Sequence, residues 1–375
     1  MINKLGIDRK LLRYFDFGIV LITVIIVFFG CANIYDATVN KYGTSFVRLQ
    51  MMWLAVGLVV VFVMTRIDYT FFSSYAPLIY WAGVLLLVYN DLTSKAVKGA
   101  SAWISIGSRA IQPSEFAKLG MIIMLAKKLE DMEGNINNVK NFFILVFYAL
   151  VPMALIVIQP DMGMTMVCFF IVLGIFFIAG LDLRVIFVGL TSLVGLVAVI
   201  WNSGILPAYM KKRLTIFLNP ESDELGFGLQ LIQSQIGIGS GNIFGIGAKF
   251  GANAGSGFVS NYVPEAHTDF IFSMVGEKWG YIGTVGLLLL YSFLLYRIMR
   301  IGKRSKDLFG TIICVGVFSS FLFSIVENIG MTIGIMPITG ITLPFMSYGG
   351  SSMLTNFMAI GLVINIGMRK KKIIF

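Results

Sequence analysis

The sequence predicts an all-α polytopic membrane protein, with about ten transmembrane helices in a single integral membrane domain over residues 1–375. Hydrophobic residues make up 57% of the 375 residues, whereas charged residues make up only 13%. The mean hydropathy is +0.87, and a water-soluble domain could not bury that much apolar surface. Apolar runs also recur at lengths close to the ~20 residues that a helix needs to cross a bilayer.

Ten apolar segments are expected to form these helices. Their ranges are 16–36, 46–65, 70–90, 114–129, 142–159, 162–180, 184–202, 271–297, 309–328 and 353–368. The first follows a basic stretch, as in a signal sequence, but it is longer than the apolar part of a signal and no small-residue cleavage site follows it. We therefore expect a retained first span. The fourth is short, and Pro160 separates the fifth from the sixth.

The distribution of lysine and arginine predicts the orientation of the spans. With ten spans both termini lie on the same side of the membrane. That side holds most of the basic residues, namely those of the N-terminus, Arg66, Lys127, Lys128, Lys140, Arg184, Arg297, Arg300, Lys303, Arg304, Lys306 and 369–372. Basic residues favour the cytoplasmic side, so both termini are expected in the cytoplasm of a protein of the cell inner membrane. The large polar loop at about 203–270, between the seventh and eighth spans, then lies outside.

The formal net charge of +10 does not indicate nucleic acid as a partner. The basic residues lie in short clusters between apolar runs, whereas a nucleic-acid-binding face would gather them on a soluble module. Cys31, Cys168 and Cys314 lie inside apolar runs without the spacing of metal ligands, and they are expected to be buried.

Some basic residues lie in the loops expected outside, against the usual bias. They are Lys95, Lys98 and Arg109 in the loop at 91–113, and Lys211, Lys212, Arg213 and Lys249 in the large loop. One interpretation is that translocated loops tolerate some lysine. The other is a basic pocket for an anionic head group at the outer surface.

Charged residues within or beside the spans are candidates for function. Glu115 and Lys118 are three residues apart and share a helix face. They either line a polar interior or form a salt bridge that only fixes packing. Asp161 either caps the helix that follows it or orients a cation. Glu327, inside the ninth span, is expected to face the interior of the bundle.

Asp269 stands just before the eighth span. A carboxylate at such an apolar boundary suits a general base, and the alternative is an acidic residue at a helix start. His267 is two residues earlier and either shares that face or has a structural role. Ser347 belongs to the last outer loop, whose prolines and glycines indicate irregular backbone shielded by protein or by a cavity. The glycines between 237 and 257 show no Walker pattern, so ATP use is not supported.

Several motifs, in order along almost the whole chain, carry a resemblance to a known family. They are Lys98-Gly99-Ala100 to Trp103, Gln112-Pro113-Ser114-Glu115, Gln159-Pro160-Asp161, Gln233-Ser234 with Gly239-Ser240-Gly241, Pro264 to Phe272, and Leu343-Pro344-Phe345 to Ser352. On these motifs the chain resembles the SEDS family (shape, elongation, division and sporulation), and its rod-shape members more than its division members.

The resemblance implies a ten-helix inner-membrane glycosyltransferase that polymerises lipid II into peptidoglycan strands outside the membrane during cell elongation. It implies a class B penicillin-binding protein as the transpeptidase partner. The family's essential aspartate falls on Asp269, its Glu and Lys of the fourth span on Glu115 and Lys118, and its Gln-Pro-Asp aspartate on Asp161. A lipid II flippase is the alternative, and it would need a polar path reaching the cytoplasmic half.

The substrate-binding residues expected from charge and resemblance together are Lys98, Trp103, Arg109, Glu115, Lys118, Asp161, Lys212, Arg213, His267 and Ser347. No dedicated metal-ligand cluster is present, although Mg²⁺ or Mn²⁺ could help to hold a diphosphate. The chain departs from the family at Ala102, where an arginine is common, and at Met164, where a threonine is usual. It also has Glu277 then Lys278 where two glutamates are common.

Overall fold

The structure, a computed structural model, describes residues 13–93, 103–106, 109–203, 211, 215–223, 226–247 and 257–369. Its helices are α2 (Phe17–Tyr42), α3 (Ser45–Arg66), α4 (Tyr69–Ser74), α5 (Ala76–Thr93), α6 (Pro113–Asp131), α7 (Val139–Ile158), α8 (Met162–Ile178), α9 (Leu183–Asn202), α11 (Phe227–Ser240), α12 (Phe258–Tyr262), α13 (Ile271–Lys303), α14 (Leu308–Ile333) and α15 (Gly350–Met368). A hairpin of β1 (Ile104–Ile106) and β2 (Arg109–Ile111) precedes α6, and a 3-10 turn, η1, spans Pro220–Ser222. The all-α class is confirmed.

Each of the ten predicted spans overlaps a helix, and the third, 70–90, covers both α4 and most of α5. Within the described residues, α2, α3, α5, α7, α13, α14 and α15 are long and apolar enough to cross a membrane, and α8 and α9 contain shorter apolar helices. Helix α6 is continuous and covers the fourth predicted span, but charged residues near both of its ends shorten its apolar stretch. Helix α13 continues to Lys303, beyond the predicted end at 297, because charged residues end its apolar pattern but not its helix.

Acidic and amide side chains begin several of these helices. Asp16, Asn138, Asp161, Asp182 and Asp307 each accept a hydrogen bond from a backbone N–H in the first turn of α2, α7, α8, α9 and α14, respectively. These N-caps satisfy donors that the helix itself leaves unpaired. They therefore fix where the chain leaves a loop and enters a span.

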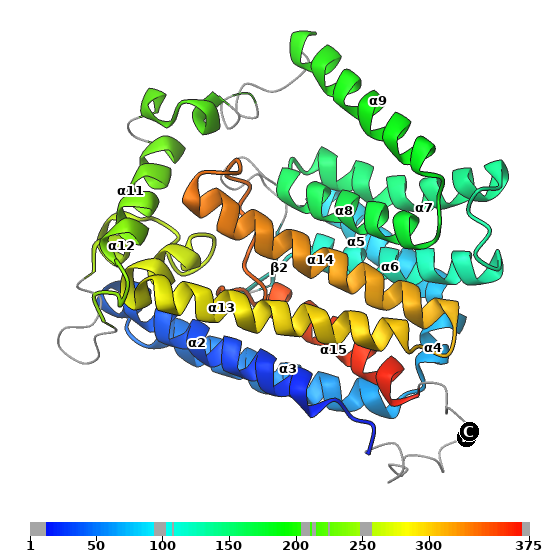
Figure 1. The fold of residues 1–375 in the computed structure, drawn as a ribbon, viewed down its shortest axis with the longest axis horizontal. Helices are drawn as coiled ribbons and strands as arrows, with labels where there is room; N and C mark the ends of the chain where they lie inside the picture. The colour runs from blue at the N-terminus through cyan, green and yellow to red at the C-terminus, as the bar shows by residue number, and fades with distance from the viewer. Residues whose placement is uncertain are drawn as a thin grey trace.

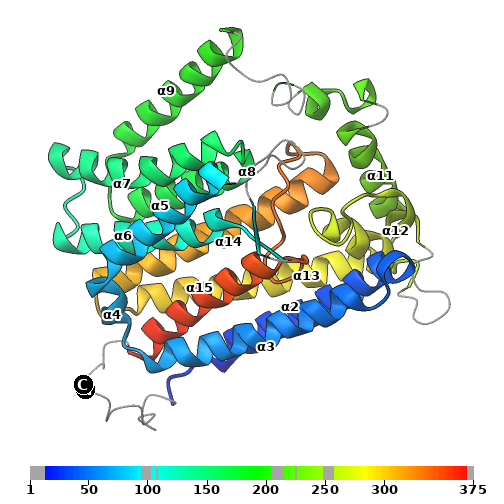
Figure 2. The same cartoon turned by 180° about the vertical axis from the view of Figure 1, so that it is seen from behind.

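Helix α14 lies at the centre of the bundle (Figure 1) and contacts α6, α8, α11, α13 and α15. Helix α15 packs against α3, and α5 packs against α6 (Figure 2). Small residues permit the last contact, since a Cβ on Gly83 of α5 would lie 3.0 Å from Cα of Ala117 on α6. Such close approach supplies packing energy where lipid gives helices no hydrophobic drive to associate.

Helix α9 projects away from the other helices in both views (Figures 1 and 2). Its side chains are exposed along most of its length, among them Phe187 and Val194. In a bilayer this apolar surface faces lipid rather than water.

The large polar loop before α13 is anchored on the first part of that helix. This helix is broken at Gly280, whose φ is 62°. Just before the break, the carbonyl oxygens of Glu277 and Lys278 accept hydrogen bonds from Ile246 N and Gly247 N, respectively. Lys278, at one of the positions where the sequence departs from the family that it resembles, is fully buried, and its Nζ lies 3.6 Å from Asp36 Oδ2 of α2. Its neighbour Glu277 accepts hydrogen bonds from the first N–H groups of α12. The cluster of charges therefore joins α2, α12 and α13 at this end of the bundle.

Candidate active site

A cavity of about 510 Å³ opens where α6, α8 and α13 begin. This volume is within the ~300–1,000 Å³ usual for ligand cavities. Its walls come from the starts of α6 and α8, the segment 264–270 before α13, the loop 338–349, and the first turns of α15. Phe227 and Gln230 of α11, Ser324 of α14 and Trp103 before β1 complete the lining. Segments far apart in the sequence therefore meet at one end of the bundle.

Glu115 and Lys118 form a buried ion pair in this cavity. Lys118 Nζ lies 2.8 Å from Glu115 Oε2, and each side chain is only 6% exposed. Thr355 of α15 also donates to Glu115 Oε2, at 2.7 Å. The pair is thus held between α6 and α15, and its two charges balance one another.

Asp161 joins the starts of α6 and α8. Its Oδ1 accepts from Met164 N at 3.0 Å, which makes it the N-cap of α8. Its Oδ2 accepts from Gln112 Nε2 at 2.9 Å, and Gln112 directly precedes α6. The predicted capping role is confirmed, and the carboxylate also lines the cavity.

Asp269 is half-buried in the cavity wall, and the backbone around it is bonded to its neighbours. Asn328 Nδ2 donates to Asp269 O at 2.8 Å. Ser347 Oγ donates to Thr268 O at 2.7 Å, and Tyr348 N donates to His267 O at 2.9 Å. The aspartate is therefore set on a segment clamped by α14 and by the loop before α15.

The described lining of the cavity is acidic. Its carboxylates are Glu115, Asp161, Glu265 and Asp269, and among the described lining residues Lys118 is the only cation. Other basic side chains predicted for the site, namely Lys98, Lys212 and Arg213, lie outside the described residues, as does the side chain of Arg109. The backbone of Arg109 lies in β2, three residues before Gln112.

His267 and Ser347 are not among the residues that line the cavity. The His267 ring packs against Phe46 of α3, with ring centroids 4.8 Å apart, and against Tyr348 at 6.1 Å. Ser347 is buried and accepts from Leu343 N at 2.8 Å. Both residues hold the two loops together behind the cavity wall.

Several lining or supporting polar residues were not predicted from the sequence: Gln112, Glu265, Asn328, Thr339, Thr355 and Asn356. Asn328 and Thr355 lie within predicted spans, and a polar side chain there is itself a signal of an interior role. For Glu265 the signal comes only from the structure: its φ is 57°, a backbone conformation that non-glycine residues rarely adopt and that often marks a functional site.

Comparison with known proteins shows the family to which this chain belongs. The model of the FtsW/RodA/SpoVE family, described as cell cycle proteins, matches residues 10–372. This chain belongs to the FtsW/RodA/SpoVE family. It is 35% identical to stage V sporulation protein E of Bacillus subtilis, with 94% of this chain and 96% of the relative covered. It is 34% identical to a protein of Treponema pallidum named peptidoglycan glycosyltransferase RodA, covering 95% and 98%.

A solved structure agrees with this membership in FtsW/RodA/SpoVE. It is described as the structural coordination of polymerization and crosslinking by a peptidoglycan synthase complex. One chain of it matches with a TM-score of 0.81 and 32% identity, over 94% of this chain and 97% of its own. The arrangement of helices described above is therefore the fold of this family.

Proposed function

We propose that this chain is a peptidoglycan glycosyltransferase that polymerises lipid II into glycan strands at the outer face of the cytoplasmic membrane during cell elongation. The names of its relatives support the reaction class. One observation carries the proposal. The cavity brings Asp269, a candidate base, into the same chamber as Lys118, a buried cation, at the end of the bundle where α11 and α12 lie (Figure 1).

In the proposed reaction Asp269 is the general base. Its carboxylate takes the proton from the 4-hydroxyl of the acceptor sugar, and that oxygen bonds to the anomeric carbon of the lipid-linked strand. The bond from this carbon to the diphosphate oxygen breaks, and the electron pair leaves with the diphosphate. Attack opposite the leaving group inverts the carbon and gives the β-linkage. A positioned base of this kind contributes about 10²- to 10⁴-fold.

The leaving diphosphate is assigned to the side of the cavity near Lys118. Positive charge placed there stabilises the charge that develops as the bond breaks. Because Glu115 already balances Lys118, the diphosphate needs further positive charge. The predicted basic residues of the outer loops, Lys98, Arg109, Lys212 and Arg213, are the proposed source within the chain.

A divalent cation, Mg²⁺ or Mn²⁺, is a second proposed source. In the part of the chain that the structure describes, no group of three or more His, Cys, Asp or Glu side chains could hold a metal. Magnesium is commonly held by one or two carboxylates together with substrate phosphates, so the acidic lining fits an ion that arrives with the diphosphate. The ion would supply a Lewis acid for the leaving group.

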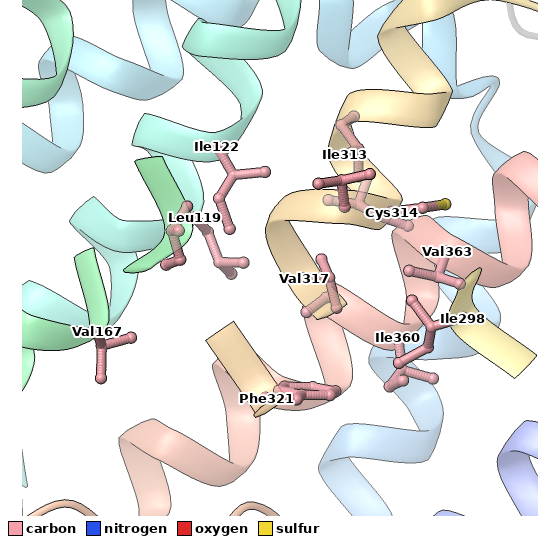
Figure 3. Packing of buried hydrophobic residues seen from close by; sticks show 14 of the residues in the cluster. Leu119, Ile122, Val167, Ile298, Ile313, Cys314, Val317, Phe321, Ile360 and Val363 are labelled. Atoms are coloured by element: carbon pink, nitrogen blue, oxygen red, sulfur yellow. The ribbon is translucent and has the colours of Figure 1, made fainter. Parts of the chain in front are cut away.

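The alternative, a lipid II flippase, needs a polar route toward the cytoplasm. Beyond Lys118 along α6, in the half of the bundle that is proposed to face the cytoplasm, the helices instead pack through apolar side chains. They include Leu119, Ile122, Val317 and Phe321 (Figure 3). All four are at most 5% exposed. This packing supports a site that opens outward only, and so favours the polymerase.

Purified protein in detergent, given lipid II with and without a class B penicillin-binding protein, tests the proposal. Detergent removes the two membrane sides, so strand formation cannot depend on flipping. We expect glycan strands on a gel, in larger amount with the partner. A protein that makes no strands with any such partner, yet moves lipid II across reconstituted vesicles, would be the flippase.

A further inference from the structure

The proposed reaction assigns no role to Glu327, a buried carboxylate beside the cavity. Glu327 lies on α14 and is 2% exposed. It is not among the residues that line the cavity, but its Oε1 accepts a hydrogen bond from Thr339 Oγ1, at 2.9 Å. Thr339 does line the cavity. Glu327 therefore lies one residue layer behind the wall.

The turn that Glu327 holds is packed on both sides. Gly340 has a φ of +80°, and a Cβ at this position would lie 3.3 Å from Asp269 Oδ2. On the other side, Thr339 O would lie 3.0 Å from a Cβ on Gly163 of α8. A shift of this turn therefore changes the space available to the Asp269 carboxylate.

The next residue of α14 completes the arrangement. Asn328 is fully buried, and its Nδ2 donates to Asp269 O at 2.8 Å and to Ile341 O at 2.7 Å. One side chain thus ties the backbone of the proposed base to the backbone of the opposing turn. Two adjacent residues of α14 therefore bond to the two ends of the segment 339–341: Glu327 to the side chain of Thr339, and Asn328 to the carbonyl of Ile341.

We propose that Glu327 is a positioning residue for the reaction, acting through Thr339 to keep Gly340 against the Asp269 carboxylate. The inference rests on the proposed function, because it needs Asp269 to be the base. Its physical reason is that a displacement of ~1 Å in a reacting group can reduce turnover about a hundredfold. The role requires a hydrogen-bond acceptor at Glu327 and does not require its charge.

The test uses the full chain in complex with its penicillin-binding protein and measures kcat and KM for lipid II polymerisation. Glu327→Leu removes the acceptor, Glu327→Gln keeps an acceptor of similar shape, and Thr339→Val removes the donor. Thr332→Val is the matched control, because it deletes a buried hydroxyl of α14 that donates to Ile329 O of its own helix. Thermal unfolding and partner co-purification report folding.

We expect Glu327→Leu to lower kcat roughly tenfold to a hundredfold with KM within about twofold of wild type. Glu327→Gln and Thr332→Val should stay close to the wild-type kcat. The double variant Glu327→Leu/Thr339→Val should be no slower than either single variant, because both changes break the same bond. If Glu327→Leu does not fold, Thr339→Val alone tests the inference, and we expect its kcat to be lowered because it breaks the same hydrogen bond.

Two results would overturn the inference. One is wild-type turnover in Glu327→Leu or, where that variant does not fold, in Thr339→Val. The other is a Glu327→Gln variant as slow as Glu327→Leu, since that would require the charge. Asp269→Asn in the same assay separates the two proposals: an active Asp269→Asn removes the base itself, whereas an inactive one beside an active Glu327→Leu removes only the positioning role.

Discussion

At the scale of single residues, the position of Asp269 depends on groups that lie outside the segment 264–270 that carries it. Asn328 holds its carbonyl, Ser347 holds that of Thr268, and Gly340 leaves room for the carboxylate. Each of these groups comes from α14 or from the loop before α15. Helix α14 and this loop, rather than α13, therefore determine where the proposed base lies.

A substitution at Gly340 tests this dependence. Gly340→Ala places a Cβ 3.3 Å from Asp269 Oδ2 and also strains a backbone whose φ is +80°. Gly180→Ala is the control, because its φ is +83° and its Cβ would meet nothing within 4 Å. Both changes should cost about 1 kcal/mol of stability through strain.

Only Gly340→Ala is expected to slow lipid II polymerisation, by roughly tenfold or more, because only its Cβ displaces the base. The measurement is kcat of the purified complex for both variants, with thermal unfolding alongside. Equal activity of the two variants would show that the turn does not control Asp269.

At the scale of elements, the ion pair of α6 raises the question of whether it supports chemistry or only packing. Glu115 and Lys118 are both buried, and Thr355 ties Glu115 to α15. Breaking a buried pair from one side leaves an uncompensated charge, at a cost of about 3–5 kcal/mol. Replacing both partners removes that cost, so stability and activity can be separated.

We therefore expect Lys118→Met to be strongly destabilised and Glu115→Gln/Lys118→Met to recover most of the stability. The glutamine keeps an acceptor for Thr355. If Lys118 serves the diphosphate, the double variant stays at least about tenfold slower than wild type in strand formation. Wild-type turnover in the stable double variant would reduce the pair to a packing contact.

The sequence was most informative about elements with a strong local signal. Each predicted apolar run overlaps a helix of the structure, and Asp161 was predicted as a cap from its place between Pro160 and an apolar run. Helix α4 was included in the third span and α11 was not located, because Phe227–Ser240 is rich in glycine and glutamine and has no span-length apolar run. In the structure α11 packs against α13 and α14, and the sequence does not show these contacts.

The site was less predictable than the spans. Motif resemblance selected Asp269, Glu115, Lys118 and Asp161, and the structure brings all four to one cavity. It does not bring His267 or Ser347 to that lining. Sequence spacing does not show that Asn328, nearly sixty residues from Asp269, donates to its carbonyl, because such contacts depend on how α14 packs.

At the scale of the whole molecule, the proposed chemistry requires the cavity to open on the outer side of the membrane. The lysine and arginine distribution predicts this orientation. Cys31, Cys168 and Cys314 are buried, at no more than 7% exposure, so the native chain offers a low background for thiol labelling.

A membrane-impermeant maleimide applied to intact cells reads the orientation directly. Glu221 of η1 and Lys303 at the end of α13 are both exposed. We expect Glu221→Cys to be labelled in intact cells and Lys303→Cys only after the cells are opened. The reverse pattern would place the cavity on the cytoplasmic side and would exclude strand synthesis outside.

The most direct test of the central claim is lipid II polymerisation by an Asp269→Asn variant, purified with its penicillin-binding protein. Asparagine keeps the size of the side chain but cannot take a proton at neutral pH, so the account predicts a loss of about 10²- to 10⁴-fold in kcat with unchanged unfolding temperature and partner binding. Strand formation by Asp269→Asn at a rate near that of wild type would contradict the account.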